Sequence, residues 1–409
     1  MTRPRAAVVV RNGFVYDARV LRAARTLREA GYQPLVVATL TASGQAASEV
    51  VDGLPVVRVS PSAPVAWIEQ RFQRRMAPQG VSPATSAADQ SRRGWVASPA
   101  LHAFRWARTV DYYLRAARVV LGHRPTLVHC NDHNTMWIGV AAKVLARARI
   151  LYDAHELWPD RNGRWEWRAW LLVTEAVFTR VADEVVVASP GFVGLMARRY
   201  RIPEPRVVRN VPVGAEPPPV QQAPVGDPIA VYVGALLLGR GLEQAIEAVA
   251  LVPRVRLRLI GHGGETSIGE ALLGHARAAG IEDRFEIHPP VPPERVVAAL
   301  GGASVGLSLF QPICLSHELT LPNKLFEYVA AGLPVLTSDM TVSAEFVRGH
   351  GVGEVVAARD PDAIARAISS LLDPARRESM RPRLEMTARE HTWARERERL
   401  IAAYAAAVA

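Results

Sequence analysis

Residues 321–338 read LPNKLFEYVAAGLPVLTS and contain both kinds of element from which the chain is built. Pro322 suits the first turn of a helix, and Gly332 suits the residue just after a helix ends. The apolar run at 334–338 then predicts a buried strand. A helix followed at once by such a strand is the repeating unit of a parallel sheet covered by helices.

The same alternation extends away from this unit along the chain. Short β-branched runs predict further strands at residues 6–11, 35–38, 56–59, 127–130, 150–153, 184–189, 206–210, 229–235, 255–261, 285–288 and 304–310. Between them, segments such as 18–30 space their apolar residues as amphipathic helices do. The pattern predicts an α/β protein with parallel sheets and helices on both faces.

A proline-rich stretch divides this series into two. Residues 213–228 suit neither a helix interior nor a central strand, so we expect an interdomain linker there. An N-terminal domain at 1–212, a C-terminal domain at 229–390 and a final amphipathic helix within 391–409 are then expected. A chain of 409 residues is long enough for two such cores.

Composition narrows the class of protein. No run of about 18 or more apolar residues is present, so we expect no membrane span. The first residues do not resemble a secretory leader, and Cys130 and Cys314 lack metal-type spacing. These features predict a cytoplasmic protein without a disulfide framework or a zinc site. The net charge is +10, but no nucleic-acid-binding signature accompanies it, and we expect no nucleic-acid partner.

The positive charge is concentrated in one segment. Residues 61–124 hold ten arginines against three acidic residues. Within them, residues 61–110 are rich in Pro, Ser, Ala and Arg and include Trp67, Trp95 and Trp106, which predicts an irregular insertion. Such an insertion is either a solvated loop or a functional surface. The functional alternatives are a lid over an acceptor and a contact with an anionic membrane.

Ligands bind open parallel sheets at the carboxyl ends of the strands. This rule selects residues 12–14, 131–133 and 154–156 in the first predicted domain, and 234–241, 261–264, 311–324 and 338–339 in the second. If the two edges face each other across a cleft, one ligand touches both domains.

Lys324 is one of only two lysines in the chain, and it falls in the first turn of the predicted helix. A cation there opposes the helix dipole, at a cost of a few tenths of a kcal/mol up to about 1 kcal/mol. A bound phosphate would reverse this effect, because the backbone N–H groups at a helix start attract anions. Glu327, about one turn further on, suits ribose hydroxyls. The alternative is a Lys–Glu pair on the surface of an ordinary helix.

The stretch VGALLLGRGLEQAIEA (233–248) supports the phosphate interpretation. Gly234 ends the predicted strand, and Gly239 and Gly241 flank Arg240 before a helix. Glycines let the backbone approach a ligand closely, and arginine can contact phosphate through two nitrogens. The stretch lacks the Gly-Lys-Ser/Thr ending of a P-loop. Neither half carries G-x-G-x-x-G after its first strand, which argues against NAD or FAD.

Four segments together resemble family 4, or group 1, of the glycosyltransferases with the GT-B fold. They are NGFVYDARVLRAARTLREAGY (12–32), ILYDAHELWPD (150–160), YVGALLLGRGLEQAIEA (232–248) and LPNKLFEYVAAGLPVLTS (321–338). The resemblance covers nearly the whole chain. It implies two Rossmann-like doubly wound domains that face each other across a cleft, with a C-terminal helix that crosses back onto the N-terminal domain. It also implies sugar transfer from a nucleotide diphosphate-sugar with retention of anomeric configuration, without a metal or another cofactor.

The resemblance assigns roles to particular residues. Glu327 matches the family's ribose-binding glutamate, and Arg240 falls where the family commonly has a lysine of its diphosphate clamp. His155 matches a histidine on the donor-sugar and acceptor side, and Gly13 matches a loop near the donor phosphates. The expected catalytic residues are His155, Arg240 and Lys324. The expected donor-binding residues are Gly13, Gly234, Arg240, Gly261, His262, Asn323, Lys324, Leu325 and Glu327. The expected acceptor-binding residues are Asp132, His133, His155 and Glu156.

Two positions depart from the family pattern. The first glutamate of its two-glutamate motif would stand at Leu319, with Glu318 adjacent, and the clamp arginine is replaced by Ala235. Family members with the LPNKLFEY variant often lack that glutamate. The donor sugar therefore stays open, and we hypothesise that Lys324 supplies the missing positive charge.

Other interpretations of the same residues stay open. His155 at a strand end also suits a structural hydrogen bond, and Asp132 also suits a cap on the following helix. Asp17 and Arg19 either cap and face solvent or reach the acceptor. The aromatic stripe at 164–178 suits a core or a membrane contact. The alternative functions are an epimerase or phosphorylase of the same fold, or a non-catalytic nucleotide-binding homologue, as a monomer or homodimer.

Overall fold

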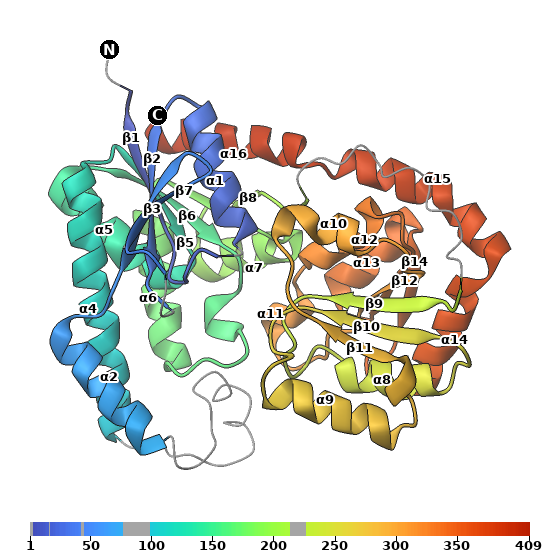
Figure 1. Ribbon diagram of the computed structural model, residues 1–409. Coiled ribbons are helices and arrows are strands. Elements are labelled where there is room, and N and C mark those ends of the chain that lie inside the picture. Colours follow the sequence, from blue (N-terminus) through green and yellow to red (C-terminus); the bar gives the residue numbers. More distant parts are fainter. Residues whose placement is uncertain (1–2, 16, 42–44, 77–98, 213–225) are drawn as a thin grey trace. The chain divides into compact units, whose positions relative to one another are not determined.

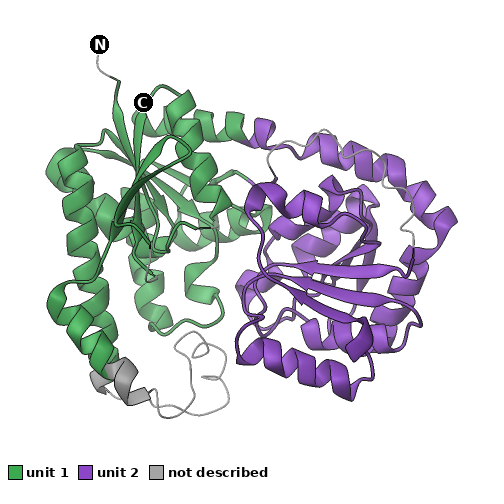
Figure 2. Cartoon of the chain, viewed as in Figure 1, with its two compact units in different colours: residues 1–208, 397–409 green, residues 209–396 purple. Residues whose placement is uncertain are grey.

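The computed structural model describes residues 3–15, 17–41, 45–76, 99–212 and 226–409 (Figure 1). The chain divides into two compact units, which are coloured green and purple in Figure 2. The first unit comprises residues 1–208 and 397–409, and the second comprises residues 209–396. The boundary between units falls just before the expected linker, most of which lies outside the described residues.

The first unit is built on an eight-stranded sheet in the order β3-β4-β2-β1-β5-β6-β7-β8. Its strands are β1 (Arg5–Val9), β2 (Gln33–Thr39), β3 (Ser48–Val51), β4 (Leu54–Val59), β5 (Leu127–Asn131), β6 (Arg149–Ala154), β7 (Glu184–Val187) and β8 (Arg206–Val207). All neighbouring strands are parallel except the pair β3 and β4. The strand order reverses between β1 and β5, so this unit has its switch point there.

Helices surround this sheet (Figure 1). They are α1 (Ala18–Glu29), α2 (Ala63–Met76), α4 (Pro99–His123), α5 (Met136–Ala146), α6 (Arg168–Val181), α7 (Pro190–Tyr200) and the last part of α16 (Trp393–Val408). No helix in the described part of the chain is both long and apolar enough to span a membrane.

The second unit has a six-stranded parallel sheet in the order β11-β10-β9-β12-β13-β14. Its strands are β9 (Ile229–Val233), β10 (Arg256–Ile260), β11 (Phe285–His288), β12 (Val305–Ser308), β13 (Val335–Ser338) and β14 (Gly353–Val356). Its helices are α8 (Leu242–Ala250), α9 (Ser267–Ala278), α10 (Val296–Ala299), α11 (Leu315–Glu318), α12 (Asn323–Ala330), α13 (Thr341–His350), α14 (Pro361–Leu372) and α15 (Pro374–Glu390). This is the strand order of a dinucleotide-binding Rossmann domain, with its switch point between β9 and β12.

Tyr328 fixes α12 against that switch point. Its ring covers Gly306 of β12 so closely that any Cβ there would collide with it. The Tyr328 hydroxyl donates a hydrogen bond to the Leu307 carbonyl at 2.8 Å and accepts one from the Val233 N–H at 3.1 Å. Burial of this side chain stabilises the packing by about 1.5–3 kcal/mol. Helix α12 is therefore held with its N-terminal end at the carboxyl edge of β9 and β12.

The last helix joins both units, as the resemblance implied. Helix α16 begins in the second unit, and residues 397–409 belong to the first. There Arg397 forms an ion pair with Glu29 of α1, and the Tyr404 hydroxyl lies 2.8 Å from His129 Nδ1. The prediction of a C-terminal helix that returns to the N-terminal domain is confirmed.

The strands predicted from sequence are all confirmed within a few residues, but other expectations need correction. The segment 61–110 is not wholly irregular, because α2 occupies Ala63–Met76 and α4 starts at Pro99. Residues 77–98, with Trp95, lie outside the described residues. Strands β3 and β14 and helices α11, α13 and α15 were not predicted. Both strands and α11 are short, and α15 lacks a continuous apolar face that would reveal it.

Candidate functional site

The switch point of the second unit brings Gly234, which follows β9, next to Lys324 of α12. Gly234 has φ +133°, and a Cβ there would lie only 3.3 Å from Lys324 Nζ. The loop after β10 also packs tightly here, since a Cβ on Gly261 would collide with the Gly234 carbonyl oxygen. Both glycines therefore serve close backbone packing, and Gly234 also leaves space for the lysine.

Lys324 is buried, with 7% of the residue exposed. Its Nζ lies 3.6 Å from the centre of the Tyr232 ring and 5.4 Å from that of Phe310. Burial lowers the pKa of Lys324 well below its usual value, and the nearby Arg240 lowers it further, while Glu327 opposes this shift without outweighing it. The alternative of a Lys–Glu pair on a helix surface is therefore wrong for Lys324.

Arg240 approaches the same place from the glycine-rich loop. Its Cζ lies 4.2 Å from the centre of the Phe310 ring, which also faces Lys324. Gly239 and Gly241, with φ +81° and +71°, adopt the left-handed conformation that side chains disfavour. A Cβ on Gly241 would collide with the carbonyl of Leu309, so the loop is pressed against the end of β12. Two cations consequently converge on one aromatic ring.

The N-terminus of α12 adds backbone N–H donors to the two basic side chains. Pro322 occupies the N-cap position, and no side chain caps the helix in the described structure. Asn323 is exposed, Leu325 is buried, and Glu327 is partly exposed about one turn beyond Lys324. A helix N-terminus beside two cations can hold a phosphate group. His262, in the turn after β10, is exposed.

Three residues of this site were not predicted from sequence. The rings of Tyr232 and Phe310 support the two cations. His317 packs edge-on against Phe310, with ring centres 4.8 Å apart, and its Nδ1 lies 3.2 Å from the Gln311 carbonyl. Burial and the nearby Arg240 lower the pKa of His317 to about 4, so its imidazole is neutral at pH 7. Phe310 follows β12 and His317 lies in the loop 311–324, whereas Tyr232 lies within β9, where no sequence signal marks its role.

Glu318 does not stand in for the glutamate that Leu319 replaces. Its Oε1 accepts hydrogen bonds from the Thr341 backbone N–H, at 3.1 Å, and from the Thr341 hydroxyl. The carboxylate thus holds the start of α13, where a negative charge is favourable. At the other departure, the Ala235 carbonyl accepts a hydrogen bond from the Tyr232 hydroxyl at 2.8 Å.

At the switch point of the first unit, Asp132 follows β5 with φ +63°. Its Oδ1 accepts a hydrogen bond from the His155 N–H at 2.9 Å, and its Oδ2 lies 3.4 Å from His155 Nδ1. Asp132 makes no side-chain cap to the helix that follows it, so that alternative is wrong. A non-glycine residue in this conformation is strained, and such strain is common at functional sites.

His155 lies between two carboxylates. Its Nε2 is 3.2 Å from Asp153 Oδ2, on the other side from Asp132. Burial lowers the pKa of His155, but Asp132 and Asp153 outweigh this effect and raise it to about 9. Burial raises the pKa of Asp132 to about 6. Between these values His155 is a cation and Asp132 an anion.

Asp153 belongs to a buried network that the sequence did not reveal. Arg19 donates to both oxygens of Asp153, at 2.8 and 2.6 Å, and to the Val208 carbonyl at 2.7 Å. His129 Nε2 lies 3.2 Å from Asp153 Oδ2. Burial raises the pKa of Asp153, but Arg19 and the two histidines hold it well below its usual value. Arg19 therefore neither caps nor faces solvent, whereas Asp17 does cap α1.

The other residues expected in the first unit have varied surroundings. His133 is 4% exposed, stacks on Trp158, and has Nε2 2.7 Å from the Thr174 hydroxyl. Burial lowers its pKa to about 3. These contacts give His133 a packing role, and we leave it out of the proposed acceptor site. Glu156 is exposed, and the Gly13 carbonyl accepts a hydrogen bond from Arg58 Nε at 2.9 Å.

The aromatic stripe on α6 divides between core and surface. Leu171, Thr174 and Phe178 are buried, as expected for a core. Trp167 is 81% exposed and Trp170 is 40% exposed, so these two rings are not part of that core.

Models of known protein families match both halves of the chain. Residues 16–214 match the model described as a glycosyl transferase 4-like domain, and residues 227–374 match that of glycosyl transferases group 1. Curated relatives include D-inositol 3-phosphate glycosyltransferases from Nocardia farcinica and Acidothermus cellulolyticus, which are 28% and 29% identical. These matches cover 55% and 42% of this chain and 48% and 42% of those proteins. The chain thus spans about half the length of the curated relatives it matches.

Solved structures resemble the chain along nearly its whole length. Sucrose-phosphate synthase from Thermosynechococcus elongatus has a TM-score of 0.73 at 18% identity, covering 98% of both chains. Anabaena HepE in complex with UDP-glucose has a TM-score of 0.69 at 13% identity, covering 98% of this chain and 99% of that one. At these identities the likeness concerns the fold, and it confirms two Rossmann-like domains of the GT-B type.

Proposed function

Because the chain belongs to the group 1 glycosyltransferases of family 4, we propose that it transfers a sugar from a nucleotide diphosphate to an acceptor hydroxyl with retention of anomeric configuration. The observation that carries this proposal is the pair of cations, Lys324 and Arg240, beside Gly234 at the N-terminal end of α12. A diphosphate there would meet two positive charges and the positive end of a helix dipole.

The donor would be held mainly by the second unit. Lys324, Arg240 and the α12 N–H group at Asn323 would contact the diphosphate, and Glu327 would accept hydrogen bonds from ribose hydroxyls. Gly261 and His262, after β10, would lie toward the transferred hexose. As the sugar leaves, negative charge grows on the diphosphate, and preorganised cations stabilise it. Two side-chain cations supply this charge without a metal ion.

The acceptor would be bound by the first unit, near Asp132, His155 and Glu156. A pKa of about 9 makes His155 an imidazolium at neutral pH. In that state it donates hydrogen bonds and cannot serve as a general base. A donor phosphate oxygen would instead take the acceptor proton in a front-face displacement.

Release of nucleoside diphosphate tests the proposed reaction. A thermal-shift screen of UDP-, GDP- and TDP-sugars selects the donor, and pools of lipid-linked, saccharide and natural-product hydroxyl compounds then serve as acceptors. We expect nucleoside diphosphate release only with an acceptor, and a product whose anomeric configuration, read by NMR, equals that of the donor. An inverted product would refute retention. Sugar phosphate release would indicate a phosphorylase, isomerised donor without acceptor an epimerase, and binding without turnover a non-catalytic homologue.

An exposed aromatic surface on α6 supports a second proposal, that this enzyme is cytoplasmic and contacts an anionic membrane. Trp167, Trp170, Val173 and Val177 are exposed along one face of α6. Trp106 of α4 lies against Trp170, with ring centres 6.1 Å apart. Aromatic side chains flanked by arginines suit a lipid interface.

Cosedimentation with vesicles of anionic phosphatidylglycerol tests this contact. We expect binding at low salt that weakens in the Trp167→Ser/Val173→Ser variant, with Val144→Ser, an exposed residue on α5, as the control. Absence of binding at low salt would refute the contact. Dimers that disappear in the same variant, seen by light scattering, would show that the stripe joins two copies instead.

A further inference from the structure

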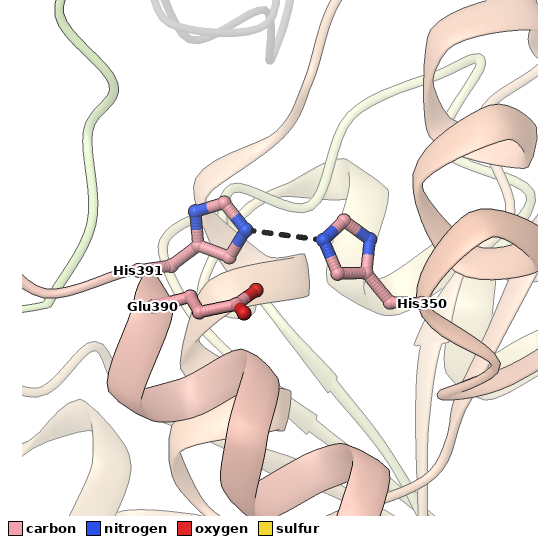
Figure 3. Close-up of side chains that lie close together, drawn as sticks. All are labelled: His350, Glu390 and His391. Carbon is pink, nitrogen blue, oxygen red and sulfur yellow. Dashed lines mark hydrogen bonds between the residues drawn. The ribbon is translucent and has the colours of Figure 1, made fainter.

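Three side chains of the second unit gather where α13 and α15 end. They are His350, the last residue of α13, Glu390, the last residue of α15, and His391, which follows it. Each offers one ligand atom, and all of these atoms lie within 4.8 Å of one another. Figure 3 shows the carboxylate of Glu390 beside the gap between the two imidazole rings. Among the described residues, this is the one group of histidine, cysteine and acidic side chains with such spacing.

The two imidazoles are oriented by their surroundings. His350 Nδ1 lies 2.8 Å from the Phe346 carbonyl, which can only accept, so Nδ1 carries the hydrogen. In the neutral ring this leaves the lone pair on Nε2, which faces His391. The His391 ring packs against Phe326 and Phe346, with ring centres 5.2 and 5.4 Å away. A backbone carbonyl behind a histidine is the usual outer partner of a metal ligand.

The distance between the rings suits a tetrahedral ion. His350 Nε2 and His391 Nε2 are 3.4 Å apart. A tetrahedral Zn²⁺ site with Zn–N bonds of about 2.0–2.1 Å places two nitrogen ligands about 3.3–3.4 Å apart. Two imidazoles and one carboxylate favour zinc over Mg²⁺ or Ca²⁺, which prefer all-oxygen sites. We propose that His350, Glu390 and His391 bind a Zn²⁺ ion, with water in the fourth position.

This site is separate from the donor site but linked to it by packing. Phe326, which packs against the His391 ring, lies on α12 two positions beyond Lys324. Helix α16 starts at Trp393, two residues after His391, and leads into the first unit. A bound ion would fasten the ends of α13 and α15 together at the point where the chain leaves the second unit. It would act on the stability of the second unit and on the rigidity of α12, without touching substrate.

Titration of the tag-free, chelator-treated full chain with Zn²⁺ tests the proposal. We expect one ion per chain, and four-coordinate visible absorption when Co²⁺ replaces Zn²⁺. His391→Gln should weaken binding by at least about 100-fold, because loss of a ligand exceeds the 10- to 100-fold effect of an outer partner. Glu390 is exposed, so Glu390→Gln should weaken binding while the protein stays folded. Glu385→Gln, on the same helix, is the matched control and should bind like the unaltered chain.

A rise in melting temperature on adding Zn²⁺ provides a second measurement. We expect that rise in the unaltered chain and in Glu385→Gln, and its loss in both Glu390→Gln and His391→Gln. Absence of saturable binding would overturn the proposal and leave a hydrogen bond between two histidines. The proposal would also be overturned if Glu390→Gln and His391→Gln both bound Zn²⁺ as strongly as the unaltered chain does, because the ion would then lie elsewhere.

Discussion

Each unit buries ionisable side chains near its switch point. In the first unit, residues of opposite charge lie together, whereas in the second, two basic residues lie together. In the first unit, Arg19 donates to both oxygens of Asp153, and His129 and His155 lie beside the same carboxylate. In the second, Lys324 and Arg240 both lie against the Phe310 ring, and the burial that lowers the pKa of Lys324 outweighs Glu327. The first arrangement holds the fold together. The second gathers two basic side chains, and a bound anion would favour the charged form of Lys324.

The largest expected effect is on folding stability in the first unit. Asp153→Asn would leave the Arg19 guanidinium buried without its counter-charge, which typically costs about 3–5 kcal/mol. We expect a loss of this size in the free energy of unfolding, measured by denaturant with a probe in the first unit. Asp52→Asn, which breaks exposed pairs with Arg25 and Arg28, is the control and should cost less than about 1 kcal/mol. Equal losses of unfolding free energy in both variants would show that the buried pair of Arg19 and Asp153 stabilises the fold no more than an exposed pair does.

Lys324 should behave in the opposite way. Lys324→Met keeps most of the side-chain volume and removes a buried amino group whose charged form is disfavoured by burial, so we expect the ligand-free chain to be as stable as before or up to about 2 kcal/mol more stable. Denaturant unfolding without nucleotide measures this. A clear loss of stability would show that Lys324, like Asp153, is a structural charge, and the contrast between the units would disappear.

A smaller effect is expected in the pH dependence of kcat/KM, which should change about tenfold per pH unit outside its plateau. The pKa values of about 6 for Asp132 and about 9 for His155 predict a plateau of kcat/KM between them, with a fall on either side. His155→Gln should abolish the fall above pH 9. In the folded protein the pKa of His155 is higher than its ordinary value of about 6.5. The charged ring therefore makes its full contribution to folding stability below about pH 6.5. It is lost as the pH rises through about 9. An alkaline limb that persists in His155→Gln would assign it to another group.

The smallest effect concerns Glu318. Glu318→Gln weakens the contacts that hold the start of α13, and we expect a loss of about 0.5–1 kcal/mol in stability. Donor affinity should stay unchanged, because this carboxylate is engaged by Thr341. A large loss of donor affinity with unchanged stability would show that Glu318 serves the donor after all.

The fold was predictable because periodicity is a local property. Strands such as 229–235 and their helices carry their pattern in consecutive residues, and glycines mark their ends. Helix α15 lacks a clear apolar face, and β3 is a short antiparallel edge strand, so neither left such a pattern. The helices within 61–110 were obscured by a composition typical of loops.

The candidate sites were predictable only where one segment carries the chemistry. Lys324 and Arg240 were found because a rare lysine and a glycine-flanked arginine stand at helix starts. The Phe310 ring that supports them looks like any core residue, and only the strand order brings it to both cations. The contact of Asp153 with Arg19 spans 134 positions along the chain, so no spacing rule indicates it. A strand end also does not tell whether a side chain faces inward, and His133 is buried against Trp158.

The affinity of UDP for the unaltered chain and for Lys324→Met, measured by calorimetry, tests the central claim most directly. Lys143→Met, at the chain's other lysine, is the control. We expect Lys324→Met to bind UDP about 30- to 100-fold more weakly, equivalent to about 2–3 kcal/mol for a charged hydrogen bond to phosphate. Lys143→Met should leave the affinity unchanged. Equal UDP affinity in Lys324→Met and the unaltered chain would contradict the assignment of the buried cations to the donor diphosphate.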